Sequence, residues 1–295
     1  MPDRSAFRYR VVDVFTTTPL EGNPLAVFPD AAGIDPALMP RIARELNLAE
    51  TTFVLPATRD DCVARVRIFT PMREMRFAGH PTLGTAFVLL DEGHVPAQAS
   101  PFLLEELVGA VPVRADAANP PKLWLSTPPI EAGISYDRQV CAQMLGLEQR
   151  DLLDAAPQIF SAGNPTLFVA LRDRAAVDRA WLDLRGSQQL RGSLPEPICI
   201  FVFTPTSNGA YSRMFAPEHG VAEDPATGSA TGPLAAFMMR HGLVSRADGT
   251  RFVSEQGSKM GRPSQLHVHI RGHEGVDGIE VGGHVTPLVT ASMYL

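Results

Sequence analysis

Apolar and polar residues alternate along much of the first seventy positions, as is typical of half-buried strands. Alternation or short apolar runs cover Phe7–Thr16, Thr51–Pro56 and Val63–Thr70. The stretch EGNPLAVFP, Glu21–Pro29, places a Gly-Asn-Pro turn directly before another strand-like run. Apolar residues recur at helical spacing over Pro36–Asn47. We therefore predict several strands and one helix in this part of the chain.

Two later segments carry no Asp, Glu, Lys or Arg. One lies between His80 and Asp91, and the other, PATGSATGPLAAFMM, ends just before Arg240. A helix without a polar face must be buried on all sides. We therefore predict two buried helices, one in each half of the chain.

The second half of the chain follows the plan of the first. Strand-like runs cover Ser161–Leu171 and Ile198–Pro205, and Arg251–Leu295 has the pattern of strands with glycine-rich turns. Three pairs of motifs also recur in the same order: GNP at 22 and 163, FTP and FAP at 69 and 215, and HPTLGTA and DPATGSA at 80 and 224. The three offsets, 141, 146 and 144, are close to half the length of the chain, which predicts an internal duplication.

The duplication predicts two homologous domains, which we place at residues 1–118 and 122–285. A segment rich in proline, alanine and asparagine, Arg114–Gly133, is the expected linker between them. In this alignment His80 corresponds to Asp224, so the two repeats differ mainly in their ionisable first residue.

Composition narrows the class of partner. The 295 residues carry a formal net charge of −6 and no cluster of Lys and Arg, which argues against nucleic-acid and anionic-membrane partners. The first residues lack the apolar core of a signal peptide, and no apolar run approaches about 20 residues. Three scattered cysteines fit a reducing compartment. We expect a cytoplasmic protein with no membrane or nucleic-acid partner.

The repeated motifs have the composition of helix starts that can bind an anion. The first N–H groups of a helix are unpaired and favour a carboxylate. Gly84 and Gly228 would allow a close approach of backbone or ligand, and Thr85 and Ser229 offer hydroxyl groups or bond within the first turn. Two such helices could form two halves of one pocket. The alternative is that the repeat reflects only the constraints of a buried helix.

Signatures of cofactor and metal sites are absent from the sequence. The spacing of Gly79 and Gly84 resembles a P-loop but lacks its lysine, and no G-x-G-x-x-G follows a strand. The segment HVHIRGH holds His267, His269 and His273, for which a solvated strand face is the preferred interpretation. We expect no metal and no cofactor.

Five longer motifs resemble the PhzF family, which is named for phenazine biosynthesis and has a diaminopimelate epimerase-like fold. They are EGNPLAVF, ELNLAETTFV, FAGHPTLGTA, EDPATGSATG and EQGSKMGRPS, in family order and spanning nearly the whole chain. The resemblance implies an α+β fold of two homologous domains, each a curved, mostly antiparallel sheet or barrel around a central buried helix. It also implies that the last strand, residues 286–295, returns to the first domain, and that the protein is a homodimer.

The resemblance further implies a cofactor-independent isomerase that moves a proton by general acid/base catalysis. The best-known member isomerises trans-2,3-dihydro-3-hydroxyanthranilate, a small carboxylated ring. The acid/base glutamate of the family falls on Glu50, with supporting residues at Gly79, His80, Asp224 and Ser229. Epimerases of this fold use a cysteine at each helix start, and neither segment has one here.

We therefore assign Glu50, His80 and Asp224 to catalysis. We assign Gly79, Gly228, Ser229 and Asn23 to the substrate site, with Asn23 in a turn that lines it. His80 and Asp224 could pair, or Asp224 could grip a substrate amine or cap its helix. Two other functions remain open: an amino-acid or hydroxy-acid racemase or epimerase using Glu50 and His80 as opposed bases, and a non-catalytic binding protein of the same fold.

Overall fold

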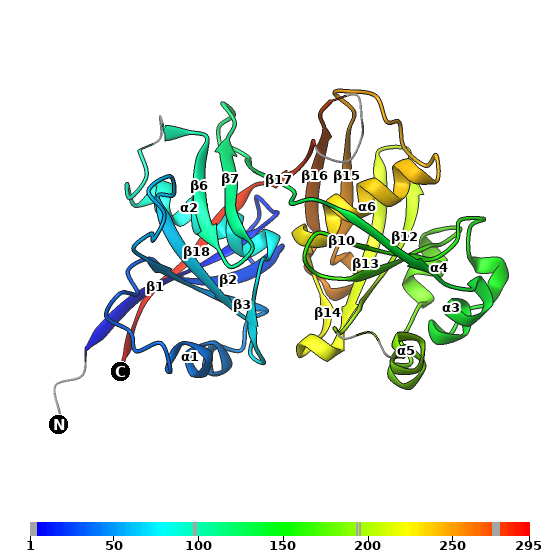
Figure 1. Ribbon diagram of the computed structural model, residues 1–295, viewed down its shortest axis with the longest axis horizontal. Helices are drawn as coiled ribbons and strands as arrows, with labels where there is room; N and C mark the ends of the chain where they lie inside the picture. Colours follow the sequence, from blue (N-terminus) through cyan, green and yellow to red (C-terminus); the bar gives the residue numbers. More distant parts are fainter. Residues whose placement is uncertain (1–4, 97–98, 193, 195, 273–277) are drawn as a thin grey trace. The chain divides into compact units, whose positions relative to one another are not determined.

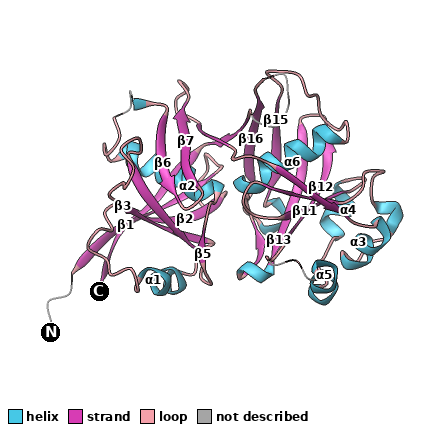
Figure 2. Ribbon diagram, in the orientation of Figure 1, coloured by secondary structure: helices cyan, strands magenta, loops and turns pink. Residues whose placement is uncertain are grey.

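The computed structural model describes residues 5–96, 99–192, 194, 196–272 and 278–295 (Figure 1). The chain forms two compact units: unit 1 comprises Met1–Ser126 and Gly282–Leu295, and unit 2 comprises Thr127–Val281. Strands dominate both units and helices are few, so the fold is α+β (Figure 2). Among the helices of the described residues, none has the length and apolar character needed to cross a membrane.

Unit 1 is a sheet that surrounds the helix α2. Most neighbouring strands are antiparallel, but β2 pairs with β3 and β4 with β6 in parallel. The strands are β1 (Ala6–Val14), β2 (Asn23–Phe28), β3 (Glu50–Leu55), β4 (Ala64–Phe69), β5 (Glu74–Met75), β6 (Phe102–Glu106), β7 (Gly109–Ala115), β8 (Leu123–Ser126) and β18 (Val285–Tyr294). The helices are α1 (Met39–Leu46) and α2 (Gly79–Asp91).

Unit 2 repeats this arrangement around α6, with additional helices outside the sheet (Figure 1). Its strands are β9 (Glu131–Ser135), β10 (Gln158–Ser161), β11 (Thr166–Ala170), β12 (Cys199–Thr206), β13 (Gly209–Ala216), β14 (Val221–Asp224), β15 (Arg251–Gln256) and β16 (Ser264–Ile270). Its helices are α3 (Arg138–Met144), α4 (Arg174–Arg179), α5 (Leu184–Arg191) and α6 (Gly228–Arg240). A further strand, β17 (Ile279–Gly283), crosses the boundary between the units.

The strand pairings show that the two units share one topology. In unit 1 the series from β1 through β2, β3, β4 and β6 to β7 is antiparallel, parallel, antiparallel, parallel, antiparallel. The series from β10 through β11, β12, β13 and β15 to β16 in unit 2 is the same. The predicted duplication is therefore visible in the order and sense of the pairings.

The two charge-free segments form the buried central helices that the sequence predicts. Nearly every residue in the first two turns of α2 is buried, and α6 is buried along most of its length. In unit 2, the Phe237 ring of α6 lies 5.7–5.9 Å from the rings of Phe160, Phe168 and Phe203. These aromatic contacts anchor α6 within its sheet.

Gly84 serves helix packing. A Cβ atom at this position would lie 2.5 Å from the Leu25 side chain and 3.0 Å from that of Val14. The absence of a side chain therefore lets α2 approach β1 and β2. The sequence allowed two interpretations of Gly84: a close approach of backbone, or a close approach of a ligand. The structure supports the first and not the second.

The helices correct the register of the repeat. They begin at Gly79 and Gly228, 149 residues apart, rather than at the offset of 144 inferred from the motifs. The Thr82 and Thr231 hydroxyls, also 149 apart, each donate to the carbonyl four residues earlier. The counterpart of His80 is therefore Ser229. Asp224 instead ends β14, outside the helix.

The expected domain boundary is displaced by one strand. The sequence prediction puts Leu123–Ser126 in the second domain and within a linker, but this segment forms β8 and pairs with β7 of unit 1. Its apolar residues are buried, so burial outweighs the proline-rich composition of the surrounding segment. At the other end, β18 pairs with β1 over nine positions and also belongs to unit 1.

Candidate active site

Three predicted site residues meet at one edge of unit 1. Strands β2 and β3 run parallel, with Leu25 opposite Glu50, so their amino ends lie at the same edge. Asn23 begins β2, Glu50 begins β3, and His80 is the second residue of α2. The Thr52 and Thr85 hydroxyls lie 2.8 Å apart and tie β3 to α2. Side chains from three elements are thereby held together.

The His80 ring lies between Asn23 and Glu50. Its Nδ1 is 3.2 Å from the Asn23 amide nitrogen, and its Nε2 is 3.2 Å from Glu50 Oε2. The side chain of Glu50 is 15% exposed, against 4% for His80, and Asn23 is fully buried. Of the three side chains, Glu50 is the one most accessible to a substrate.

Burial lowers the pKa of His80 to about 3. The ring is therefore neutral near pH 7 and carries one proton. A neutral imidazole with so low a pKa is a poor acceptor of a proton from carbon, but it can donate one hydrogen bond. His80 is suited to orienting Glu50.

Acidification is expected to destabilise the fold through His80. In the unfolded chain His80 binds a proton below about pH 6.5, whereas the folded ring does so only near pH 3. Its contribution to stability is present above pH 6.5 and is lost as the pH falls. Between pH 7 and pH 5 we expect a loss of about 2 kcal/mol in the free energy of unfolding. Urea unfolding should show a weaker pH dependence for His80→Gln, and an equal dependence would contradict the prediction.

Asn23 is a partner of His80. Its side chain is fully buried, and its amide nitrogen contacts the His80 ring. The sequence did not predict this contact, and the place of Asn23 in the substrate site stays a prediction.

In unit 2, Asp224 belongs to a network before the start of α6. The Thr227 hydroxyl donates to Asp224 Oδ2 at 2.5 Å. The N-cap position of α6 is Thr227, and the helix begins only at Gly228. Asp224 therefore does not cap the helix, which removes one of the alternatives for its role.

Gln256 holds this network and was not predicted. It is fully buried. Its side-chain oxygen accepts from the Thr227 N–H at 3.1 Å, and its nitrogen donates to the Asp224 carbonyl at 2.7 Å. At Gly257, φ is +78° and a Cβ would lie 2.6 Å from the Pro225 carbonyl. The motif EQGSKMGRPS contained both residues, but a sequence does not show which loop they support.

Replacing Gln256 by leucine is expected to destabilise unit 2. The substitution removes the acceptor for the Thr227 N–H and the donor to the Asp224 carbonyl, and both groups would lose a buried partner. We expect a loss of about 2 kcal/mol in the free energy of unfolding, measured by urea titration. The matched control is Gln265→Leu, because Gln265 is exposed on the adjacent strand. Equal stability of the two variants would contradict the assigned role.

The start of α6 offers hydrogen-bond donors. Ser229, its second residue, is half-buried, and its hydroxyl makes no hydrogen bond within the part of the chain that the structure describes. Gly79 and Gly228 are the first residues of their helices and are buried. The sequence prediction of anion-binding helix starts stays a prediction for these three residues.

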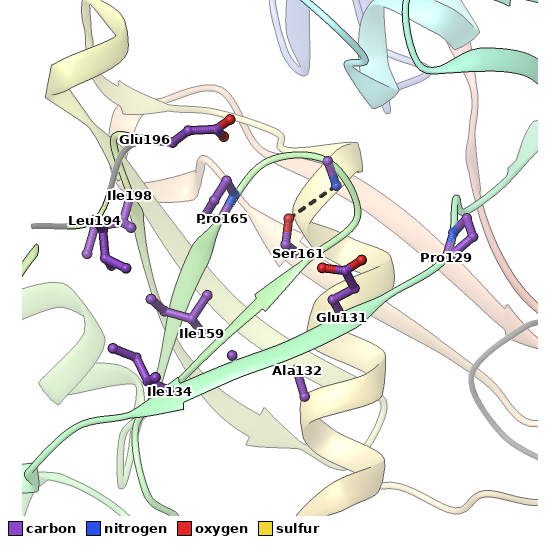
Figure 3. A pocket seen from close by; sticks show the side chains of 12 residues that line it. Pro129, Glu131, Ala132, Ile134, Ile159, Ser161, Pro165, Leu194, Glu196 and Ile198 are labelled. Atoms are coloured by element: carbon purple, nitrogen blue, oxygen red, sulfur yellow. Dashed lines mark hydrogen bonds between the residues drawn. The ribbon is translucent and has the colours of Figure 1, made fainter.

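A pocket of about 460 Å³ in unit 2 lies elsewhere (Figure 3). Its lining combines apolar side chains such as Ile134, Ile159 and Ile198 with the carboxylates of Glu131 and Glu196. Figure 3 also shows the Ser161 hydroxyl accepting from a backbone N–H. None of the predicted site residues lines this pocket.

The predicted solvated face of HVHIRGH is wrong for His269, whereas His267 is half-buried. His269 is buried, and its Nδ1 lies 3.4 Å from Glu280 Oε2. His273 lies outside the described residues. No cluster of three or more His, Cys, Asp or Glu side chains able to hold a metal occurs among the residues described.

The chain is similar to known proteins over nearly its whole length. A family model described as phenazine biosynthesis-like protein, PhzC-PhzF, matches residues 12–291. A trans-2,3-dihydro-3-hydroxyanthranilate isomerase of Pseudomonas aeruginosa is 35% identical, over 98% of this chain and 99% of that protein. An uncharacterized isomerase of Mesorhizobium japonicum is 34% identical, over 97% of this chain and 98% of that protein.

Solved structures show the same fold. A predicted epimerase of Pseudomonas aeruginosa is 34% identical, has a TM-score of 0.81, and is matched over 97% of this chain and 99% of its own. A PhzF-family phenazine biosynthesis protein of Bacillus anthracis has a TM-score of 0.87 at 22% identity, over 99% and 100% of the two chains. At that identity the second match supports the fold alone.

Proposed function

We propose that this chain, an isomerase of the phenazine biosynthesis-like (PhzC-PhzF) family, moves a proton within a small carboxylated substrate. Glu50 is the proton carrier in this proposal. The observation that carries it is the Glu50–His80 pair: a partly exposed carboxylate held 3.2 Å from a buried, neutral imidazole. Such a pair provides one base at a fixed position.

The reaction requires no change of oxidation state overall. The Glu50 carboxylate takes a proton from one carbon, and the electron pair of the broken C–H bond delocalises over the adjacent double bond. The Glu50 carboxylic acid then returns the proton to a carbon one allylic system away, which shifts the double bond. General acid/base catalysis of this kind contributes about 10²–10⁴-fold in rate. No cofactor or metal takes part.

We assign Asp224, Gly79, Gly228 and Ser229 to substrate binding. Helix N-termini favour anions, so the backbone at Gly79 and Gly228 and the Ser229 hydroxyl are suited to a carboxylate. Asp224 is suited to a substrate amine, since its carboxylate is oriented by Thr227. The named substrate of the Pseudomonas relative is both a carboxylate and an amine, and it is our proposed substrate.

The geometry favours isomerisation over racemisation. A two-base racemase needs a second base on the opposite side of the stereocentre. His80 lies beside Glu50, and its pKa of about 3 makes it a weak base. The alternative with Glu50 and His80 as opposed bases therefore lacks support.

We also propose that the protein is a cytoplasmic homodimer. The three cysteines are free and buried, which suits a reducing compartment. Sedimentation velocity should give a mass near twice the 31.9 kDa of one chain. A monomer at micromolar concentration would reject the dimer.

The test of the function is proton exchange in D2O. The protein would be incubated with trans-2,3-dihydro-3-hydroxyanthranilate, beside a panel of small amino and hydroxy acids, and each C–H followed by proton NMR. Deuterium at the carbon that gains the proton, with a shifted double bond, is the expected result. Exchange at a stereocentre without that shift would favour a racemase. Exchange in another compound of the panel, and none in trans-2,3-dihydro-3-hydroxyanthranilate, would reject the proposed substrate but leave the proposed mechanism in place.

A further inference from the structure

His80 is flanked by two groups with opposite hydrogen-bonding character. The Asn23 amide nitrogen faces Nδ1, and Glu50 Oε2 faces Nε2, each at 3.2 Å. An amide nitrogen can only donate a hydrogen bond, and an ionised carboxylate can only accept one. The two neighbours therefore favour the same protonation state of the ring: a lone pair at Nδ1 and a proton at Nε2.

We propose that Asn23 is a positioning residue that fixes His80 as its Nε2–H tautomer and so directs an N–H to Glu50. Asn23 donates to Nδ1, which keeps that nitrogen free of a proton. The single ring proton is then on Nε2, the nitrogen that lies 3.2 Å from Glu50 Oε2. The inference rests on the proposed function for its catalytic consequence, although the tautomer itself does not depend on a substrate.

The backbone leaves the Asn23 side chain little freedom. Asn23 pairs with Val14 in the ladder between β1 and β2. The preceding Gly22 has φ of +66°, and a Cβ there would lie 2.3 Å from the Val14 carbonyl. Only glycine fits this turn without a shift of the backbone. The turn thus places the amide against the ring, and full burial of Asn23 keeps water from competing for Nδ1.

The tautomer distinguishes the two oxygens of Glu50. Oε2 is the Glu50 oxygen beside His80 Nε2, and its attraction to a proton on that nitrogen is strongest when Oε2 carries no proton of its own. The substrate proton is then held on Oε1 and returned from it. An Nδ1–H tautomer would instead present a lone pair to Oε2, so Glu50 would lose its orienting donor and face repulsion.

Nitrogen NMR of histidine-labelled protein tests the inference directly. Long-range proton–nitrogen spectra distinguish a protonated ring nitrogen from an unprotonated one, and comparison with His80→Gln assigns the His80 signals. At pH 7 we expect a protonated Nε2 and an unprotonated Nδ1. In Asn23→Asp the carboxylate can only accept, so Nδ1 should become protonated. The rate of proton exchange into the substrate should fall by about 10²-fold.

The control is the same substitution in the second copy of the motif. Asn164→Asp changes the matching Gly-Asn-Pro tripeptide of unit 2 and should leave both the His80 signals and the exchange rate unchanged. A wild-type ring protonated at Nδ1 would overturn the inference, whether or not Asn23→Asp folds. A folded Asn23→Asp with Nδ1 still unprotonated would do the same.

The spectra also separate this inference from the proposed function. An Nε2–H ring in a protein that exchanges no substrate proton would reject the function and leave the tautomer standing. Substrate exchange that requires Glu50, in a protein whose ring is Nδ1–H, would reject only the role of Asn23.

Discussion

Replacing Glu50 by glutamine is expected to abolish proton exchange while substrate binding changes little. Glutamine keeps the size of the side chain, and its amide oxygen can still lie beside His80 Nε2 as Glu50 Oε2 does. It cannot take up a proton from carbon at neutral pH. We expect exchange to fall by about 10²–10⁴-fold, measured by NMR in D2O, with binding followed by calorimetry.

A matched control is available in the same family motif, ELNLAETTFV, which begins with a second glutamate. Glu45→Gln makes the same chemical change at an exposed position of α1 and should retain full exchange. Full activity in Glu50→Gln would exclude Glu50 as the proton carrier. Loss of both binding and exchange would instead indicate that the carboxylate binds substrate.

Replacing Glu106 by glutamine is expected to stabilise the protein. Glu106 is buried at the end of β6, and burial raises its pKa to about 8. The Thr82 hydroxyl lies 2.6 Å from Glu106 Oε1 and 2.7 Å from the Ala78 carbonyl. A hydroxyl has one proton, so when Thr82 donates to Ala78, Glu106 must be protonated and donate to Thr82. A glutamine amide makes the same donation without a titrating proton.

The sign of the pH effect follows from the raised pKa. The unfolded carboxyl ionises above about pH 4.5, whereas the folded one stays neutral to about pH 8, so stability is lost as the pH rises between these values. Glu106→Gln should therefore raise the free energy of unfolding by about 3 kcal/mol at pH 7 and by less than about 1 kcal/mol at pH 5.

Glu105 provides the contrast for this experiment. It is the preceding residue of β6 and accepts hydrogen bonds from Thr58, which hold its pKa below the usual range. Glu105→Gln should be neutral or mildly destabilising. A gain of stability in Glu105→Gln, or a gain in Glu106→Gln that does not depend on pH, would contradict the assignment of a buried, protonated Glu106.

The sequence predicted burial best for helices and strands whose residues follow one pattern from end to end. A helix without charged residues must be buried whatever surrounds it, so the segments that form α2 and α6 could be identified without a structure. The same holds for β4, whose burial alternates along most of its length. Their burial is set by residues within the element, which is why the pattern is sufficient.

The register of the duplication could not be obtained in this way. HPTLGTA and DPATGSA share three identical residues at matching positions. The alignment based on that similarity paired His80 with Asp224, whereas the structure pairs His80 with Ser229. The hydroxyl bonds of Thr82 and Thr231 reveal it, because they mark the first turn of each helix. A motif of seven residues does not show where its helix begins.

The parts of the candidate site that depend on contacts between distant segments were also missed. Gln256 supports Asp224 from 32 positions away, and Asn23 contacts His80 from 57 positions away. Neither partnership leaves a pattern in one sequence, since each is made by the topology of the sheet. For Asn23 the sequence predicted a turn at the substrate site but not the contact with the histidine.

The return of β18 to unit 1 has a consequence for the order in which the protein forms during synthesis. Unit 2 is one continuous segment, Thr127–Val281, whereas β1 pairs with β2 early but receives its second partner from β18, Val285–Tyr294. At about 5–20 residues per second, the 169 residues after Ser126 take roughly 10–30 seconds to synthesise. The half of the protein that leaves the ribosome first is therefore expected to be completed last, once β18 has been synthesised.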